Sequence, residues 1–369
     1  MYPTEGVTSA YDQVEPIEID CDVAVVGLGA GGGMVFHDLA KEGVDVVGIE
    51  MGEYVQTEEV EQTEDRMIPR LFQESGARAT DDFAVSILQG KGVGGSTVHN
   101  TNLCKRLPGP ILERWEADYG LDWATSDQLQ EDFAAVEELL GVERIPDERV
   151  NANNAVMERA LDVLGWSGGR MKHNRDHTDC KQSGFCELGC PNDGKQNAAK
   201  VLVPEGLKAG GRVLTEARVE EVLTRDGEVT GVRGVACHPE AGIEGVEFLV
   251  RADEVCLAAS ATGSAALIQK SDIPDPWGLA GTNLHLHPGA TVIGMFDGPD
   301  DDPIRSWLGN PQSVECTEYL EVGPDARRRA WILPGAAHPA AAAMFAPGFG
   351  ADHGRMMRQY PKMAAFIVM

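Results

Sequence analysis

The sequence predicts an α/β protein whose N-terminal part contains a parallel β-sheet. Residues 22–50, DVAVVGLGAGGGMVFHDLAKEGVDVVGIE, follow the order of a short β-branched strand, a tight glycine turn, a helix ended by Gly43 and a second strand. A strand–helix–strand unit of this kind is typical of a parallel sheet. The 369 residues suffice for two to three domain-sized units, and the chain shows no internal repeat.

Helices dominate the first half of the chain after this unit. Residues 53–65 carry six carboxylates and no basic residue, which is typical of a solvated loop or lid rather than a metal site. The helix expected over residues 125–142 starts with a suitable N-cap residue, Thr125 or Ser126. Helices are expected over residues 109–120, 125–142 and 153–166.

The second half of the chain favours strands. Residues 166–196 form an irregular segment rich in Cys, His and Gly. Strands joined by a turn at Asp226-Gly227 are expected over 213–237. A strand and a helix follow over 253–271, and from about residue 290 the pattern changes to strands, loops and prolines.

Composition excludes several kinds of partner. The net charge of −28 repels nucleic acid and anionic membranes. No run approaches the ~20 apolar residues that span a bilayer. The first twenty residues are acidic and have no apolar core of a secretory signal, so we expect a cytoplasmic protein. Eight cysteines are too few for a disulfide scaffold.

The glycine turn predicts a dinucleotide site. Gly27, Gly29 and Gly32 match G-x-G-x-x-G between a strand and a helix. The first glycine permits the tight turn, the second lets backbone approach a pyrophosphate, and the third lets helix and strand pack closely. Glu50 ends the next strand, where a carboxylate can accept hydrogen bonds from ribose hydroxyls. The motif alone does not distinguish FAD from NAD.

Six segments in order resemble the glucose–methanol–choline (GMC) oxidoreductases, nearest the long-chain alcohol oxidase and cholesterol oxidase side of that family. The segments are GLGAGG with GIE, GKGVGGSTVHN, GCPNDGKQNA, ARVEEVLTRDGEVTGV, VCLAASATGSAALIQKS and GTNLHLHPGA. The resemblance covers nearly the whole chain and implies an FAD enzyme. An NAD-dependent dehydrogenase is disfavoured because it leaves residues 90–100 unexplained.

The resemblance also implies a domain plan. A Rossmann-like FAD-binding domain would comprise residues 1–125 and 197–290. A helical, Cys-rich insertion would occupy 126–196. Residues 291–369 would form part of an α+β substrate domain built on a mainly antiparallel sheet, incomplete at the C-terminus.

The second glycine-rich stretch, by resemblance, lies along the pyrophosphate and the isoalloxazine ring, with polar side chains near the reactive edge of the flavin. Two other segments would contact the adenine and the ring, and Ser260 replaces the usual glycine of one of them. The cofactor-binding residues implied in this way, beyond those of the first motif, are Gly92, Gly94, Gly95, Ser96, His99, Asn100, Val219, Ala258 and Ala259.

His99 departs from the apolar residue of many family members. In choline oxidase a histidine at the same offset from the glycine pair bonds covalently to the flavin. We therefore hypothesise that His99 is flavinylated, and the alternative is a neutral histidine packed near the ring.

The segment CKQSGFCELGC leaves three alternatives open. Cys180, Cys186 and Cys190 follow His173 and His177 closely. Three thiols and a histidine could bind zinc. A disulfide, or free structural thiols, explain the same spacing, and the absence of compact C-x2-C pairs favours the thiols.

The resemblance places the catalytic histidine in a C-terminal part that has no match here. The chain ends at KMAAFIVM, which is expected to be a strand and to leave an open sheet edge. His338 and His353 do not resemble the catalytic motif, and His285 and His287 are expected to be structural. The base is therefore expected beyond Met369, and the catalytic residues stay unknown.

The function implied is FAD-dependent oxidation of the CH–OH group of an alcohol, with hydride transfer to flavin N5. A hydrophobic alcohol or sterol is the expected substrate, and the electron acceptor, oxygen or another, stays open. The alternative is a non-catalytic FAD-binding half that a second, complementing C-terminal polypeptide completes.

Overall fold

The computed structural model describes residues 2–296, 303–320, 329–335 and 338–369. The chain divides into two compact units, residues 1–100 with 187–286 and residues 101–186 with 287–369. The second unit thus groups residues 101–186 with the C-terminal strands. The three-domain plan and its limits stay a prediction.

The first unit contains a seven-stranded sheet in the order β1-β8-β3-β2-β11-β10-β9. The first five strands of this order run parallel, and β11, β10 and β9 pair antiparallel. The predicted α/β class and the antiparallel pair around Asp226-Gly227 are confirmed. The strands are β1 (Val7–Ser9), β2 (Ile17–Val26), β3 (Val46–Ile49), β8 (Arg212–Thr215), β9 (Ala217–Arg225), β10 (Glu228–Cys237) and β11 (Glu244–Leu257).

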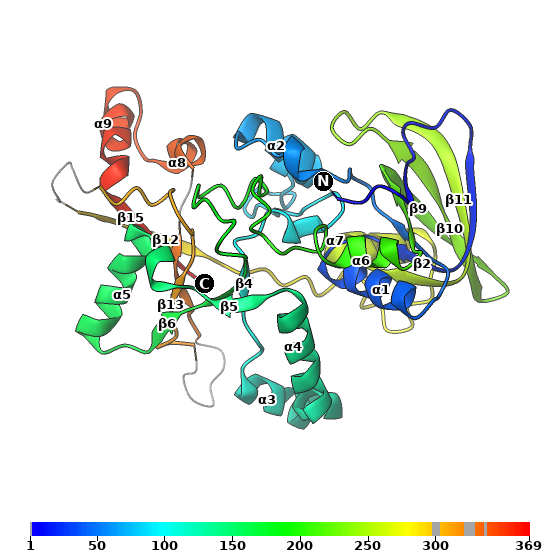
Figure 1. Cartoon of the computed structure of the whole chain (residues 1–369), viewed down its shortest axis with the longest axis horizontal. Coiled ribbons are helices and arrows are strands. Elements are labelled where there is room, and N and C mark those ends of the chain that lie inside the picture. Colours follow the sequence, from blue (N-terminus) through cyan, green and yellow to red (C-terminus); the bar gives the residue numbers. More distant parts are fainter. Residues whose placement is uncertain (1, 297–302, 321–328, 336–337) are drawn as a thin grey trace. The chain divides into compact units, whose positions relative to one another are not determined.

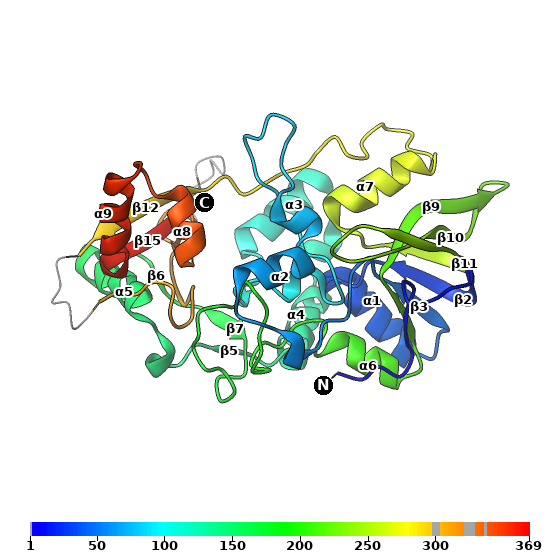
Figure 2. The same ribbon diagram turned by 90° about the horizontal axis from the view of Figure 1, so that it is seen from above.

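Helices cover both faces of this sheet. Alternate residues of β2 point to opposite faces: Val25 packs with α1 and α6, whereas Ala24 and Val26 pack in the other core with Leu267 of α7. Figure 1 shows α1 and α6 side by side, and Figure 2 shows α7 on the other side of the strands. The helices are α1 (Ala30–Lys41), α2 (Glu64–Leu71), α6 (Leu202–Lys208) and α7 (Ser260–Lys270), with 3₁₀ turns η1 (Thr57–Glu59), η2 (Gln73–Gly76) and η3 (Gly95–Thr97).

The second unit contains a five-stranded antiparallel sheet in the order β12-β15-β14-β13-β6. This confirms the mainly antiparallel second sheet. A small sheet in the order β4-β7-β5 accompanies it. The strands are β4 (Leu103–Cys104), β5 (Val142–Arg144), β6 (Gly168–Arg170), β7 (Lys172–Asn174), β12 (Ala290–Met295), β13 (Val314–Cys316), β14 (Ile332–Gly335) and β15 (Met363–Val368).

The predicted open edge at AAFIVM is wrong. These residues form β15, which is paired on both sides, with β12 and with β14. The edge strands of this order are β12 and β6, and Val292, Ile293 and Met295 of β12 are about half exposed. A strand signal is local, but its place within a sheet depends on partners distant in sequence.

The three helices expected in the second unit are present, whereas α8 and α9 lie after residue 290, where strands, loops and prolines were expected, so that expectation is corrected. Ser126 caps α4 as expected, because its hydroxyl accepts the N–H of Leu129 at 3.2 Å. Within the described ranges, no helix has the length and apolar character to cross a bilayer. The helices are α3 (Gly109–Tyr119), α4 (Asp127–Leu139), α5 (Ala152–Leu164), α8 (Pro339–Phe345) and α9 (Ala351–Gln359), with η4 (Asp122–Thr125), η5 (Asp147–Arg149) and η6 (Tyr360–Lys362).

Candidate cofactor site

The first glycine loop joins β2 to α1. Gly27 has a φ of 96°, in the left-handed region that favours glycine, and its N–H donates to the Ile49 carbonyl at 2.8 Å. A Cβ atom on Gly27 would lie 2.5 Å from the carbonyl oxygen of Ala258. One on Gly32 would lie 1.8 Å from the carbonyl oxygen of Gly27. Both positions therefore require glycine, as the dinucleotide motif predicts.

The N-terminus of α1 presents backbone donors that have no partner within the helix. Its N-cap residue is Gly29, which has no side chain to cap the helix, and its first turn has no acidic residue. The first N–H groups of a helix have no partner within the helix. A Cβ atom on Gly31 would meet nothing within 4 Å, so there is open space beside Gly31 in this turn. These donors and the positive end of the helix dipole fit a pyrophosphate group.

The second glycine loop lies directly against the first. The N–H of Gly94 donates to the Leu28 carbonyl at 2.8 Å. A Cβ atom on Gly95 would lie 2.9 Å from the Cα of Gly29. Gly94 itself has a φ of 94°. Two glycine-rich stretches some sixty residues apart in sequence thus build one backbone-lined site.

Glu50 links the two loops. Its side chain is 5% exposed. One carboxylate oxygen accepts the N–H of Leu28 at 3.1 Å, and the other accepts those of Gly92 at 3.0 Å and Gly52 at 3.1 Å. Burial raises the pKa of Glu50, and the backbone N–H groups oppose that shift. The sequence motif did not indicate this structural role, and the contact with ribose stays a prediction.

His99 is packed inside the second loop. It is 8% exposed, its ring centroid lies 4.1 Å from that of Phe72, and a Cβ on Gly90 would lie 2.6 Å from its Nε2. Burial, and next the Lys195 charge, lower the pKa of His99 to about 4, so the ring is neutral at pH 7. Its Nε2 makes no hydrogen bond to any part of the chain that the structure describes.

The polar neighbours of His99 hold the loop itself. The Ser96 hydroxyl accepts the N–H of Gly90 at 3.0 Å. Lys195 is 2% exposed, and its Nζ donates to the carbonyls of Val98 at 2.9 Å and Asn100 at 2.6 Å. Lys195 thus clamps the loop on both sides of His99. Lys195 lies within the motif GCPNDGKQNA, but the sequence analysis assigned it no role.

The remaining predicted residues lie at the ends of neighbouring strands. The N–H of Ala258 donates to Val26 at 2.8 Å, which places the end of β11 beside the first loop. Ala259 is the N-cap residue of α7, and Ser260 after it has a φ of 67°. Val219 is half-buried in β9, whose first N–H, that of Ala217, donates to the Glu50 carbonyl at 3.0 Å.

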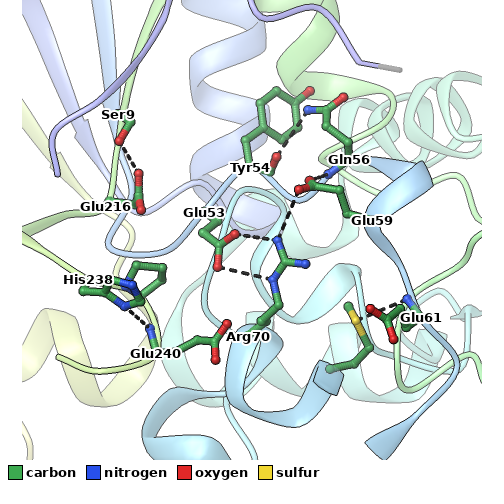
Figure 3. A network of polar contacts seen from close by, with 12 residues as sticks. Ser9, Glu53, Tyr54, Gln56, Glu59, Glu61, Arg70, Glu216, His238 and Glu240 are labelled. Carbon is green, nitrogen blue, oxygen red and sulfur yellow. Dashed lines mark hydrogen bonds and ion pairs between the residues drawn. The ribbon is translucent and has the colours of Figure 1, made fainter. Parts of the chain in front are cut away.

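The acidic run after β3 is partly paired. Figure 3 shows Arg70 of α2 pointing at Glu53 and Glu59, with nitrogen–oxygen distances of 2.6 and 3.6 Å. Glu59 also accepts the N–H of Gln56 at 2.8 Å. These contacts correct the expectation of a purely solvated loop, because a basic residue outside the run folds back onto it.

The histidines outside the loops fill local roles. Nε2 of His338 lies 3.1 Å from the Gly184 carbonyl, and Nε2 of His353 lies 2.9 Å from the Ala343 carbonyl. His285 is exposed, with its Nδ1 2.8 Å from the Asn283 carbonyl. None of the eight cysteines, all of which lie within the described ranges, forms a disulfide. Among the residues with described positions, no three His, Cys, Asp or Glu side chains group to hold a metal ion.

Comparison with known proteins adds family relationships to this geometry. The family model described as GMC oxidoreductase matches residues 68–289. An uncharacterized GMC-type oxidoreductase of Mycobacterium tuberculosis is 33% identical over the whole chain, which covers 56% of that protein. The long-chain-alcohol oxidase FAO3 of Arabidopsis thaliana is 25% identical over 99% of the chain and 50% of its own length. The chain thus spans about half the length of these curated relatives.

Solved structures show the same fold. A formate oxidase variant from Aspergillus oryzae RIB40 superposes with a TM-score of 0.63 at 15% identity, over 96% of this chain and 73% of that one. Pyridoxine 4-oxidase from Mesorbium loti gives a TM-score of 0.61 at 16% identity, over 94% and 71%.

Proposed function

Because the chain belongs to the GMC oxidoreductase family, whose members bind FAD, we propose that it forms the FAD-holding part of an enzyme that oxidises the CH–OH group of an alcohol. The observation that carries this proposal is the contact between the two glycine loops around Glu50, beside the uncapped start of α1. Bound FAD supplies the acceptor for the two electrons that leave the alcohol.

The chain's own residues would hold and orient the cofactor. Backbone N–H groups of the first turn of α1 would bind the pyrophosphate. Gly29 and Gly95 lie side by side without side chains, which lets a ligand approach both loops closely. Lys195 would keep the carbonyls of Val98 and Asn100 fixed, so that the loop keeps one shape beside the ring.

The substrate is proposed to be a hydrophobic alcohol or a sterol. Support comes from the relatives named long-chain-alcohol oxidases, which match between 57% and 99% of this chain at 25–28% identity. A panel of primary alcohols of increasing chain length, with a sterol, would test the substrate class. Higher kcat/KM for short, polar alcohols would contradict it.

FAD binding tests the site directly. Gly29→Val places a side chain between the loops, at a φ of −74° that any residue adopts. Gly109→Val is the matched control, because its Cβ meets nothing within 4 Å at the start of α3. We expect Gly29→Val to lose flavin affinity by at least tenfold, on the order of 1.4 kcal/mol, with unchanged melting temperature. Equal FAD affinity in both variants, or a wild-type chain that binds no FAD, would refute the proposal.

Covalent attachment through His99 is a finer proposal. Support comes from its neutral, buried ring, whose Nε2 accepts or donates no hydrogen bond within the described ranges. The flavin-loaded protein would be precipitated with acid. Absorbance that stays with the pellet in wild type and moves to the supernatant in His99→Asn supports the linkage. Complete release from wild type excludes it.

The alternative function is that of a half-enzyme. The exposed apolar side chains of edge strand β12 favour it, because such an edge can accept a further strand. The chain would be co-expressed with the part of the mycobacterial relative that lies outside the match. Alcohol oxidation that appears only in the mixture supports the half-enzyme, and activity of the chain alone excludes it.

A further inference from the structure

A cavity in the second unit reverses the charge balance of the chain. The sequence has 59 acidic residues against 31 lysines and arginines, whereas this cavity of about 700 Å³ is lined by four basic and two acidic side chains. Among its described lining residues only Leu320 is apolar. The charged lining residues are Lys105, Arg144, Arg170, Lys172, Glu315 and Glu318. Such a wall suits a hydrophilic anion and not the hydrophobic alcohol proposed as substrate.

Strand pairing brings two of these cations together. Arg144 of β5 and Lys172 of β7 are directly opposite residues of an antiparallel pair. The Cβ atoms of such a pair lie about 4.5–5.5 Å apart on one face of the sheet, and like charges at these positions destabilise the pairing. Lys105 follows β4, whose Cys104 lies opposite Lys172 on the other side of β7. The small sheet β4-β7-β5 thus brings three cations to one cavity.

Two of the four lining cations have carboxylate partners of their own. Nζ of Lys105 lies 2.7 Å from the carboxylate of Glu315. Arg170 forms ion pairs with Asp147 and with Glu158, the latter at 2.8 Å. The charges of Lys105 and Arg170 are therefore balanced within the chain.

The other two lining cations are not balanced in this way. Nζ of Lys172 lies 3.1 Å from Glu137, but Nη2 of Arg106 lies 2.9 Å from the same carboxylate, so that one negative charge serves two cations. The side chain of Arg144 is exposed and forms no ion pair or hydrogen bond with any residue that the structure describes. Arg144 and Lys172 together therefore carry more positive charge than the nearby acids offset.

The backbone beside Arg144 leaves room for a ligand. Nη2 of Arg144 lies 3.7 Å from the position that a Cβ atom on Gly169 would take, and no other atom lies within 4 Å of that position. Gly169 has a φ of 153°, in the region that favours glycine. The lining acid Glu318 accepts the N–H of Ser167 at 2.8 Å, so this carboxylate also has a partner. A guanidinium beside such an open strand can donate two parallel N–H groups to a phosphate or carboxylate.

We propose that Arg144 and Lys172 form a binding site for a small hydrophilic anion that carries phosphate or carboxylate groups. The planar guanidinium of Arg144 holds one such group with two hydrogen bonds, and the ammonium of Lys172 adds a second positive charge. The bound anion also offsets the repulsion between these two opposite residues. The site uses side-chain cations of the second unit, whereas the glycine loops of the first unit use backbone donors, so the proposal does not rest on the proposed function.

Isothermal titration tests the site with two probes, inorganic pyrophosphate and citrate. The chain is first loaded with FAD, so that pyrophosphate finds the glycine loops occupied. We expect at least one probe to bind with one-to-one stoichiometry and a Kd of about 1 mM or lower. Tighter binding of pyrophosphate assigns the site to phosphate groups, and tighter binding of citrate assigns it to carboxylates. If neither probe binds, the proposal is overturned.

A pair of matched variants separates this site from a general effect of net charge. Arg144→Gln removes an exposed guanidinium, so the variant should fold as wild type does. Arg159→Gln is the control, because Arg159 is also exposed, lies on α5 outside the cavity and forms no ion pair within the described ranges. We expect Arg144→Gln to weaken binding of the probe by about tenfold or more, and Arg159→Gln to leave it within about twofold of wild type. Equal affinities in the two variants would overturn the proposal.

Discussion

Two adjacent glycines of α1 should respond to alanine with opposite signs. A Cβ on Gly32 would lie 1.8 Å from the Gly27 oxygen and 2.8 Å from the Ala258 Cβ. A relaxed carbon–oxygen contact lies near 3.3 Å, so α1 has to retreat by about 1.5 Å. Overpacking of this size costs about 3 kcal/mol, at the upper end of its usual range. A Cβ on Gly31 meets nothing within 4 Å, and alanine there should stabilise the helix by about 0.5 kcal/mol.

The assay is thermal unfolding of the two variants and wild type without added FAD. For a unit of about 200 residues, 1 kcal/mol shifts the melting temperature by about 2–4 °C. Gly32→Ala should therefore melt about 6–12 °C below wild type, and Gly31→Ala about 1–2 °C above it. A Gly32→Ala protein that melts within 2 °C of wild type would show that the loop and helix are less tightly packed than the structure has them.

Three further predictions concern the backbone strain at Ser260, the pH dependence of stability through His99, and the effect of Lys195 on the pKa of His99. Ser260→Gly should raise the melting temperature by about 2–4 °C, because serine at a φ of 67° is strained by about 1 kcal/mol, and a melting temperature below that of wild type would contradict that strain. The folded-state pKa of His99 is lowered from 6.5 to about 4, so the unfolded chain binds the extra proton between these values. The free energy of unfolding should therefore fall by about 3 kcal/mol as the pH drops from 6.5 to 4. Urea unfolding at both pH values measures this loss, which should be smaller in His99→Phe. Lys195→Met should raise the pKa of His99 in an NMR titration, because the Lys195 charge helps to lower it, and an unchanged pKa would refute that coupling.

Local signals predicted much of the fold. The short β-branched strand before the first glycine loop, the glycines of that loop and the Asp226-Gly227 turn each depend on a few neighbouring residues, and the structure has all of them. The place of β15 between β12 and β14 was missed, because pairing partners about 30 to 70 residues away leave no mark in the strand's own sequence.

The candidate site likewise has residues that the sequence motif predicts and contacts that only the folded structure shows. The motif identifies Gly27, Gly32 and Glu50 by spacing, and the close packing at both glycines agrees with it. The inward hydrogen bonds of Glu50 and the clamp formed by Lys195 depend on a loop that arrives from elsewhere in the chain. A charged residue within an irregular segment gives no periodic signal, so only the folded structure assigns it.

The pairing of β2 with β11 also determines how long β2 lacks a partner strand during synthesis. Val26, just before the first glycine loop, pairs with Leu257, so this strand lacks one neighbour until about 230 more residues have been made. At roughly 5–20 residues per second, that wait lasts on the order of 10 to 50 seconds. During that time an apolar strand edge stays exposed on the nascent chain, where a chaperone or a slowed ribosome would have its largest effect on yield.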